Sequence, residues 1–213
     1  MSKFFPSHQN IKVSNIDIVA FQCQDIVFQF ACIAPGAYLP VHQHPESQMG
    51  MVISGNLEMN VSGKKEFLNP LQQVYSAGSE VPHGFDTVNY SDESIFSFDL
   101  KRVTHLSTNE AVFIDLKPTS DQITNFPSHI AVGSWFTTII TQIPPGEKTS
   151  NQQSDSEEIG VIIDGKMMIN IGGEQQEIKR GQIYYAPADV IHSGYNSASE
   201  TVTLIKIVLP HHS

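Results

Sequence analysis

The sequence repeats itself, because residues of its first half recur about 110 positions later in its second half. Six of the matches below are separated by 110 positions and the last by 109, which indicates one deletion between equivalent segments. Glycines recur at turns because a tight turn needs a positive φ angle, where a side chain is costly. The matches are Pro35-Gly36 with Pro145-Gly146, Gly50 with Gly160, Gly55 with Gly165, Asn60 with Asn170, Gly63 with Gly173, Tyr75 with Tyr185, and His83 with His192. We therefore predict two copies of one structural unit.

Each copy reads as a series of short β-strands. Apolar and other residues alternate over 57–61 and again over 167–171, and a period of two is the signature of a strand. Ser62-Gly63 and Gly172-Gly173 supply hairpin turns after these segments. The further predicted strands are 26–33, 65–68, 93–100, 135–143, 175–179 and 201–209. Many short strands with glycine turns, in about 100 residues per copy, are typical of a small jelly-roll barrel.

We accordingly predict an all-β chain with two tandem jelly-roll barrels. The first would occupy residues 1–105, and residues 106–213 would hold a linker and the second barrel. The segment 102–127 is polar and contains two prolines, which favours a linker, and one short helix is predicted near 109–116.

Composition narrows the classes of partner. The net charge is −10, with 22 acidic against 12 basic residues, which argues against nucleic acid and anionic membrane. No apolar run approaches the roughly 20 residues of a membrane span. Residues 1–10 lack the pattern of a signal peptide, so we expect a cytoplasmic protein. Cys23 and Cys32 are the only cysteines, and we expect both to be free thiols in that compartment.

One group of residues has the spacing of a metal site. His42 and His44 are two positions apart, so on a strand both imidazoles project from the same face. Gln48 follows on the next predicted strand, and His83 stands on a distant one. Imidazoles with an oxygen donor suit a divalent transition ion that also holds water or substrate. We predict one metal ion, bound by His42, His44, Gln48 and His83.

This spacing resembles the cupin superfamily, whose first motif carries a glycine, two histidines, a glutamate and a closing glycine, and whose second motif carries the last histidine. The resemblance implies two double-stranded β-helix barrels and a metal, with iron as the first expectation and cobalt, nickel, zinc or manganese as alternatives. Gln48 stands where the family usually has glutamate. Because glutamine is neutral, we expect the bound dication to keep its full charge and to favour Lewis-acid work over oxygen activation.

The second copy has lost most of this motif. Gln152, Ser154, Glu158 and His192 stand at the equivalent positions, so the adjacent histidine pair is absent. Two good ligands rarely hold a transition metal. We therefore expect a degenerate second barrel without a metal of its own.

A closer resemblance covers residues 40–102, through HQHPESQMGMVISGNLEMNVSG, VPHG and FDLKR. This stretch is similar to the bicupin isomerases of the bacilysin and aeruginosin pathways. The resemblance implies a metal-dependent allylic isomerase, which moves a ring double bond of a prephenate-derived dihydro-4-hydroxyphenylpyruvate into conjugation with its 2-oxo acid side chain. Arg102 is a candidate partner for the substrate carboxylate. Glu46, Asp99 and His192 are candidates for the proton transfer, and the sequence does not choose among them.

Three other functions stay open at this point. One is a cupin tautomerase or ring-opening enzyme on unsaturated uronates, since such enzymes also carry a glutamine ligand. Another is a metal-dependent dioxygenase, and the third is a noncatalytic small-molecule-binding cupin. The sequence also leaves open whether the chain forms a homodimer.

Overall fold

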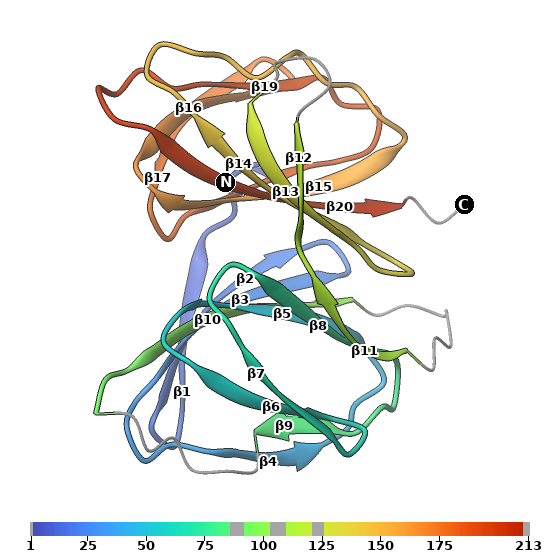
Figure 1. Ribbon diagram of the computed structural model, residues 1–213. Coiled ribbons are helices and arrows are strands. Elements are labelled where there is room, and N and C mark those ends of the chain that lie inside the picture. Colours follow the sequence, from blue (N-terminus) through green and yellow to red (C-terminus); the bar gives the residue numbers. More distant parts are fainter. Residues whose placement is uncertain (1, 86–91, 103–109, 121–125, 211–213) are drawn as a thin grey trace. The chain divides into compact units, whose positions relative to one another are not determined.

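The computed structural model describes residues 2–85, 92–102, 110–120 and 126–210, which form strands joined by turns and loops (Figure 1). The first eleven strands are β1 (His8–Val13), β2 (Ile16–Cys23), β3 (Ile26–Ile33), β4 (Leu39–His42), β5 (Ser47–Ser54), β6 (Leu57–Val61), β7 (Lys64–Leu68), β8 (Gln73–Ala77), β9 (His83–Phe85), β10 (Ile95–Arg102) and β11 (Ala111–Asp115). The remaining nine are β12 (Lys117–Ser120), β13 (Pro127–Val132), β14 (Thr137–Ile143), β15 (Ser156–Asp164), β16 (Lys166–Ile171), β17 (Glu174–Lys179), β18 (Ile183–Ala186), β19 (His192–Tyr195) and β20 (Val202–Pro210).

The strands form two barrels. The first barrel, Ser7–Leu116, has one sheet in the order β1-β2-β3-β10-β5-β8-β11 and a second in the order β4-β9-β6-β7. The second barrel, Lys117–Ser213 together with Met1–Pro6, has sheets in the orders β12-β13-β14-β20-β15-β18 and β17-β16-β19. The predicted all-β fold of two repeated barrels is confirmed. Over the described part of the chain, no helix is long and apolar enough to cross a membrane.

The segment between the barrels differs from its prediction. Residues 111–115 form β11 and residues 117–120 form β12, so the helix predicted near 109–116 is wrong in the part that is described. β11 pairs with β8 and belongs to the first barrel, which moves the boundary from 105 to 116. Residues 103–109 and 121–125 of the predicted linker lie outside the described residues. Its polar character misled the prediction because a strand at a sheet edge can be polar on its open side.

Each barrel covers the outer edge of one sheet with a segment that precedes the other barrel. In the first barrel, β11 pairs along β8, with Phe113 opposite Tyr75. In the second barrel, the amide of Tyr185 donates to the carbonyl of Phe4, and Phe4 is 5% exposed within the apolar core. The residues 2–6, here called the N-terminal arm, therefore belong to the second barrel. A segment that lies along a strand in this way shields hydrogen-bonding groups of that strand from another chain.

The hairpins explain the repeated glycines, and the strand register corrects one predicted pair. Ser62 and Gly63 have φ angles of 53° and 84°, and both residues of a type I′ turn need positive φ.

Gly50 lies opposite Tyr75, whereas its counterpart Gly160 lies opposite Tyr184 rather than Tyr185. The one-residue deletion therefore precedes Tyr75 instead of following it. A Cβ atom at Gly50 would fall 2.5 Å from Tyr75 Cε1, so the glycine makes room for the aromatic ring.

Candidate metal centre

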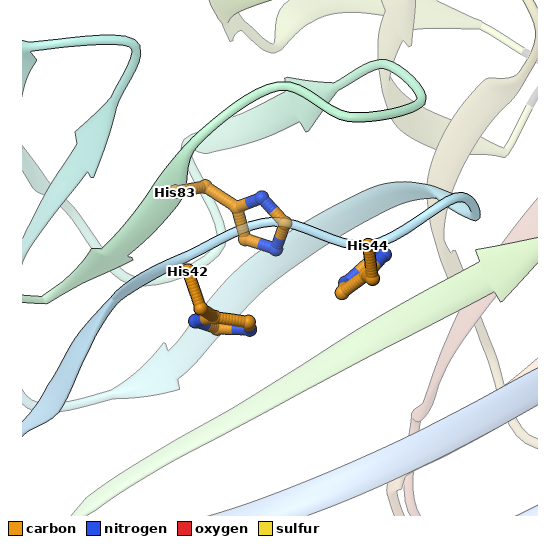
Figure 2. A group of neighbouring side chains, drawn as sticks. All are labelled: His42, His44 and His83. Atoms are coloured by element: carbon orange, nitrogen blue, oxygen red, sulfur yellow. The ribbon is translucent and has the colours of Figure 1, made fainter.

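The first barrel brings three histidines together from two paired strands. His42 ends β4, His44 follows two positions later, and His83 begins β9 directly opposite His42 in the ladder. Figure 2 shows the three imidazole rings directed toward a common space. One ring nitrogen from each histidine lies within 4.8 Å of the corresponding atoms of the other two. The predicted histidine triad is thus assembled in space.

Backbone carbonyl groups fix the tautomer of each histidine. The Nδ1 atoms of His42, His44 and His83 lie 3.0, 3.0 and 2.8 Å from the carbonyl oxygens of residues 40, 46 and 81. A carbonyl oxygen only accepts, so each Nδ1 carries a hydrogen, and in the neutral form of each ring Nε2 presents a lone pair. Glu46 Oε2 also lies 3.3 Å from His44 Nδ1 and holds this ring in the same orientation.

Gln48 supplies the fourth donor atom from β5. Its Nε2 donates to the hydroxyl of Tyr75, so its Oε1 faces the histidines. Oε1 lies 3.1 Å from His44 Nε2 and 3.3 Å from His83 Nε2. Both Gln48 and Tyr75 are only 6% exposed, so water does not compete for this contact.

These donor atoms fit a metal ion. With both nitrogens unprotonated, Oε1 meets two lone pairs, and such contacts are unfavourable unless a cation lies between the atoms. Two ligands about 2.1 Å from one ion lie about 3.0 Å apart at a right angle and about 3.4 Å apart at the tetrahedral angle. The two measured separations, 3.1 and 3.3 Å, fall within this range. Three imidazoles and an amide oxygen could therefore hold a divalent transition ion.

The histidines are prepared for coordination by their surroundings. Burial lowers the pKa of His83 to about 4 and also lowers the pKa of His42. Neighbouring positive groups, Lys101 among them, lower both values further. These two imidazoles are therefore neutral at pH 7, and a metal ion would not have to displace a proton from either ring.

A cavity of about 270 Å³ opens onto this centre. Its walls are mostly apolar, and Ile16, Leu57 and Met59 belong both to the walls and to the core of the barrel. Ile11 and Val13 line the cavity from β1 and are 41% and 42% exposed, which places the mouth of the cavity beside this strand.

Lys101 is the one cationic side chain among the cavity residues of the described chain, and Arg102 is not among them. Arg102 Nε lies 3.0 Å from Asp25 Oδ2, and its side chain is buried in this ion pair. The structure therefore does not support the predicted contact between Arg102 and a substrate. The alternation of β10 explains the difference, since Lys101 and Asp99 share one face and Arg102 lies on the other. In the sequence, the polar residues Ser97, Asp99 and Lys101 alternate with apolar residues, and this alternation indicates which side chains share the face of the cavity.

The second barrel holds a different group at the equivalent position. Glu158 takes the place of Gln48, and its Oε1 accepts a hydrogen bond of 2.5 Å from the hydroxyl of Tyr184 and lies 3.4 Å from His192 Nε2. Burial raises the pKa of Glu158 and lowers that of His192, but the contact between the two outweighs burial in both cases. The pKa of Glu158 is consequently lowered and that of His192 is raised, and the two residues form a buried ion pair.

The two adjacent histidines of the motif are absent from the second barrel. Gln152 and Ser154 stand where the first barrel has its two adjacent histidines, and Gln152 retains only an isolated bridge to His192. Within the described residues, the histidine triad of the first barrel is the one cluster of three or more His, Cys, Asp or Glu suited to a metal. The proton on His192 balances the charge of Glu158 without any bound cation.

The comparison with protein families identifies the fold. The family model described as Cupin domain matches residues 29–98 and 139–208, one match in each barrel and more than half of the chain in total. This chain is a cupin. The first match contains His42, His44, Gln48 and His83 of this cupin, and the second contains the Glu158–His192 ion pair.

Two relatives are similar to this cupin over most of its length. The crystal structure of AerE from Microcystis aeruginosa is 43% identical, covers 99% of this chain and 100% of its own, and superposes with a TM-score of 0.93. The H2HPP isomerase of Bacillus subtilis is 27% identical over 84% of this chain and 76% of its own. The resemblance predicted from residues 40–102 is confirmed by these relatives.

More distant cupins share only the fold. The oxalate decarboxylase of Lactobacillus farciminis is 13% identical, covers 99% of this chain and 87% of its own, and has a TM-score of 0.79. At this identity the similarity establishes the two-barrel architecture and carries no activity to this chain.

Proposed function

We propose that this cupin is a metal-dependent isomerase that shifts a double bond in dihydro-4-hydroxyphenylpyruvate during the biosynthesis of a natural product. The observation that carries the proposal is the cavity of the first barrel. It combines three histidines and a glutamine with a single lysine and apolar walls. The similarity to AerE and to the H2HPP isomerase supports the choice of substrate.

His42, His44, Gln48 and His83 would hold the metal, with iron as the first expectation and cobalt, nickel, zinc or manganese as alternatives. When bound, the ion supplies a Lewis acid that polarises the 2-oxo group of the substrate. The four ligands carry no negative charge, so none of them weakens this positive field. The residues around the centre then bind the substrate, exclude water and move its proton.

Lys101 is suited to bind the carboxylate of a 2-oxo acid. It lies directly opposite Gln48 in the β10–β5 ladder and lines the cavity beside the histidines. Its positive charge contributes to the lowered pKa of both His42 and His83. A carboxylate next to the metal centre would form a charge-assisted hydrogen bond with Lys101. We assign to Lys101 the role that the sequence suggested for Arg102.

The walls of the cavity suit the rest of such a substrate. A six-membered ring is mostly apolar, and Ile18, Leu39, Val52 and Phe85 offer apolar surface around the centre. A pocket of about 270 Å³ is close to the lower end of the range for small-molecule sites. The match between an apolar ring, a 2-oxo acid and this cavity favours a small organic acid over a polymer. We further propose that the reaction takes place in the cytoplasm.

A spectral assay tests the proposal. Protein loaded with one equivalent of Fe²⁺ or Co²⁺ should increase the ultraviolet absorbance of the nonconjugated dihydro compound, because the product is conjugated. The same samples would be given an unsaturated uronate, and oxygen uptake would be recorded with the iron-loaded sample. Turnover of the dihydro compound alone supports the proposal. Activity only on the uronate, oxygen consumption, or no reaction would favour the tautomerase, the dioxygenase or the noncatalytic function, respectively.

The variant Lys101→Met, which keeps the length of the side chain, should raise KM at least tenfold, the equivalent of about 1.4 kcal/mol. Lys12→Met is the matched control, because Lys12 pairs with Asp17 on the exposed surface. An unchanged KM in the Lys101→Met variant would contradict the role of Lys101.

A further inference from the structure

We propose that Asp99 is the catalytic residue that moves the proton in this isomerisation, both removing it and returning it. The inference rests on the proposed function and deepens it, since the chain was assigned no proton-transfer group above. Asp99 lines the cavity from β10 and is not one of the four candidate ligands.

The strand register places Asp99 beside the centre. Asp99 lies opposite Gly50, whose missing side chain leaves room for the ring of Tyr75 on the next strand. Lys101 lies two residues further along the same face, opposite Gln48. Residues two apart on a strand are separated by about 6.5–7 Å. A substrate whose carboxylate meets Lys101 therefore has its neighbouring carbons within reach of Asp99.

The carboxyl group of Asp99 is incompletely satisfied. Its Oδ1 is shielded from water and has no hydrogen-bond partner among the described residues. An unpaired buried oxygen costs free energy, and such groups mark sites where a ligand or a proton completes the contact. Burial raises the pKa of Asp99 to about 6, although the charge of Lys101 acts in the opposite direction. A carboxyl group in this range can both accept and release a proton near neutral pH.

The other two candidates are placed elsewhere by the structure. Glu46 contacts Nδ1 of His44, so it orients a ligand and is absent from the cavity walls. His192 lies in the second barrel, where it pairs with Glu158. Of the three candidates from the sequence, only Asp99 lines the cavity.

The proposed step is balanced without any oxidant or second substrate. The Asp99 carboxylate takes a proton from the carbon next to the 2-oxo group. The electron pair of that C–H bond forms the new double bond to the ring, and the pair of the former ring double bond forms a C–H bond at its far end. Asp99 returns its proton to this far carbon and is regenerated as a carboxylate. One proton leaves the substrate and one is added, as an isomerisation requires.

The equivalent position of the second barrel indicates that the fold does not require an acid here. Lys206 lies opposite Gly160, as Asp99 lies opposite Gly50, and the second barrel folds around it. The isosteric variant Asp99→Asn should therefore fold and bind metal normally. Asp17→Asn is the matched control, since Asp17 is an exposed aspartate in an ion pair with Lys12.

The test uses metal-loaded full-length protein and two substrates. Isomerisation of the dihydro compound is followed by its ultraviolet spectrum, and exchange of the methylene protons of phenylpyruvate is followed by NMR in D₂O. We expect Asp99→Asn to lower kcat and the exchange rate at least about 100-fold, with KM within about threefold of the wild type. Asp99→Glu should recover part of the loss. The fall of wild-type kcat at acid pH should disappear in the residual activity of Asp99→Asn.

Each outcome decides one of the two proposals. Rates within threefold of the wild type, or loss of metal or of folding in Asp99→Asn, would overturn the role of Asp99. A wild-type protein that exchanges the phenylpyruvate protons without isomerising the dihydro compound would contradict the proposed substrate and leave Asp99 as the proton carrier. A wild-type protein that does neither would contradict the proposed function itself.

Discussion

The hydrogen bond between Tyr75 and Gln48 gives the account its sharpest quantitative prediction. Tyr75→Phe removes one hydroxyl and leaves the buried Nε2 of Gln48 without its acceptor, since both side chains are only 6% exposed. A buried donor that loses its partner costs about 1–3 kcal/mol. Loss of a residue that orients a metal ligand typically weakens metal binding 10–100-fold, or about 1.4–2.7 kcal/mol. The first cost lowers the stability of the protein with and without metal, whereas the second acts on metal binding, so we expect the Kd for Co²⁺ to rise between 10- and 100-fold.

Competition between the protein and a chromophoric chelator would measure this change. Tyr184→Phe is the control, because it removes the equivalent hydroxyl in the second barrel, where Tyr184 donates to Glu158. We expect Tyr184→Phe to lower the melting temperature and to leave the Kd for Co²⁺ unchanged. A Tyr75→Phe protein that binds Co²⁺ within twofold of the wild type would refute the argument that Tyr75 orients the Gln48 ligand.

Three further predictions concern charge, pH and the N-terminal arm. The Gln48→Glu variant should bind the metal at least tenfold more tightly and have an isomerase kcat about tenfold lower, because a carboxylate offsets the charge of the ion. A kcat equal to that of the wild type would remove the support for Lewis-acid catalysis. Ionised Glu158 stabilises the fold above its ordinary pKa of 4.5, and this effect is lost as pH falls through the lowered pKa of the folded state. Protonated His192 stabilises the fold below its ordinary pKa of 6.5, and this effect is lost as pH rises through the raised pKa of the folded state. Urea unfolding should thus show the largest cost of Glu158→Gln between roughly pH 4.5 and 6.5, and a cost independent of pH would contradict the ion pair. Phe4→Ala should lower the stability of the second barrel by about 3 kcal/mol or more, and an unchanged urea midpoint would count against the arm.

The histidine triad could be predicted from the sequence, because two of its members are close in the chain and the third was found through the repeat. His42 ends β4 and His44 lies two residues beyond it, so the short spacing in the chain keeps the two imidazoles close together. The repeated glycines located the equivalent strands and so aligned His83 with His192. The prediction required only spacing, and the structure assembles the three imidazoles in the expected place.

The exact register between distant strands escaped prediction. The hydrogen bond from Gln48 to Tyr75 joins residues 27 positions apart, and only the β5–β8 register reveals it. The same register shows that Tyr184, not Tyr185, is the counterpart of Tyr75. Two adjacent tyrosines made both alignments equally good in the sequence, because a shift of one residue changes the face of the strand but not the residue type.

The choice between adjacent cations failed for a related reason. Lys101 and Arg102 are neighbours on one strand and face opposite sides, so one reaches the cavity and the other reaches Asp25. Arginine is in general a preferred partner for carboxylates, but this preference does not tell which face of the strand the side chain lies on. Likewise, the N-terminal arm packs in the second barrel although it precedes the first in sequence, and no local pattern indicates such a connection.

The central claim is that His42, His44, Gln48 and His83 bind one metal ion, and titration with Co²⁺ tests it most directly. Visible absorption of the bound ion would be recorded for the wild type, for His83→Ala and for His192→Gln. We predict one Co²⁺ per chain in the wild type and in His192→Gln, and none at the same concentrations in His83→Ala. Two ions per chain, or a His83→Ala protein that still binds Co²⁺ like the wild type, would contradict it.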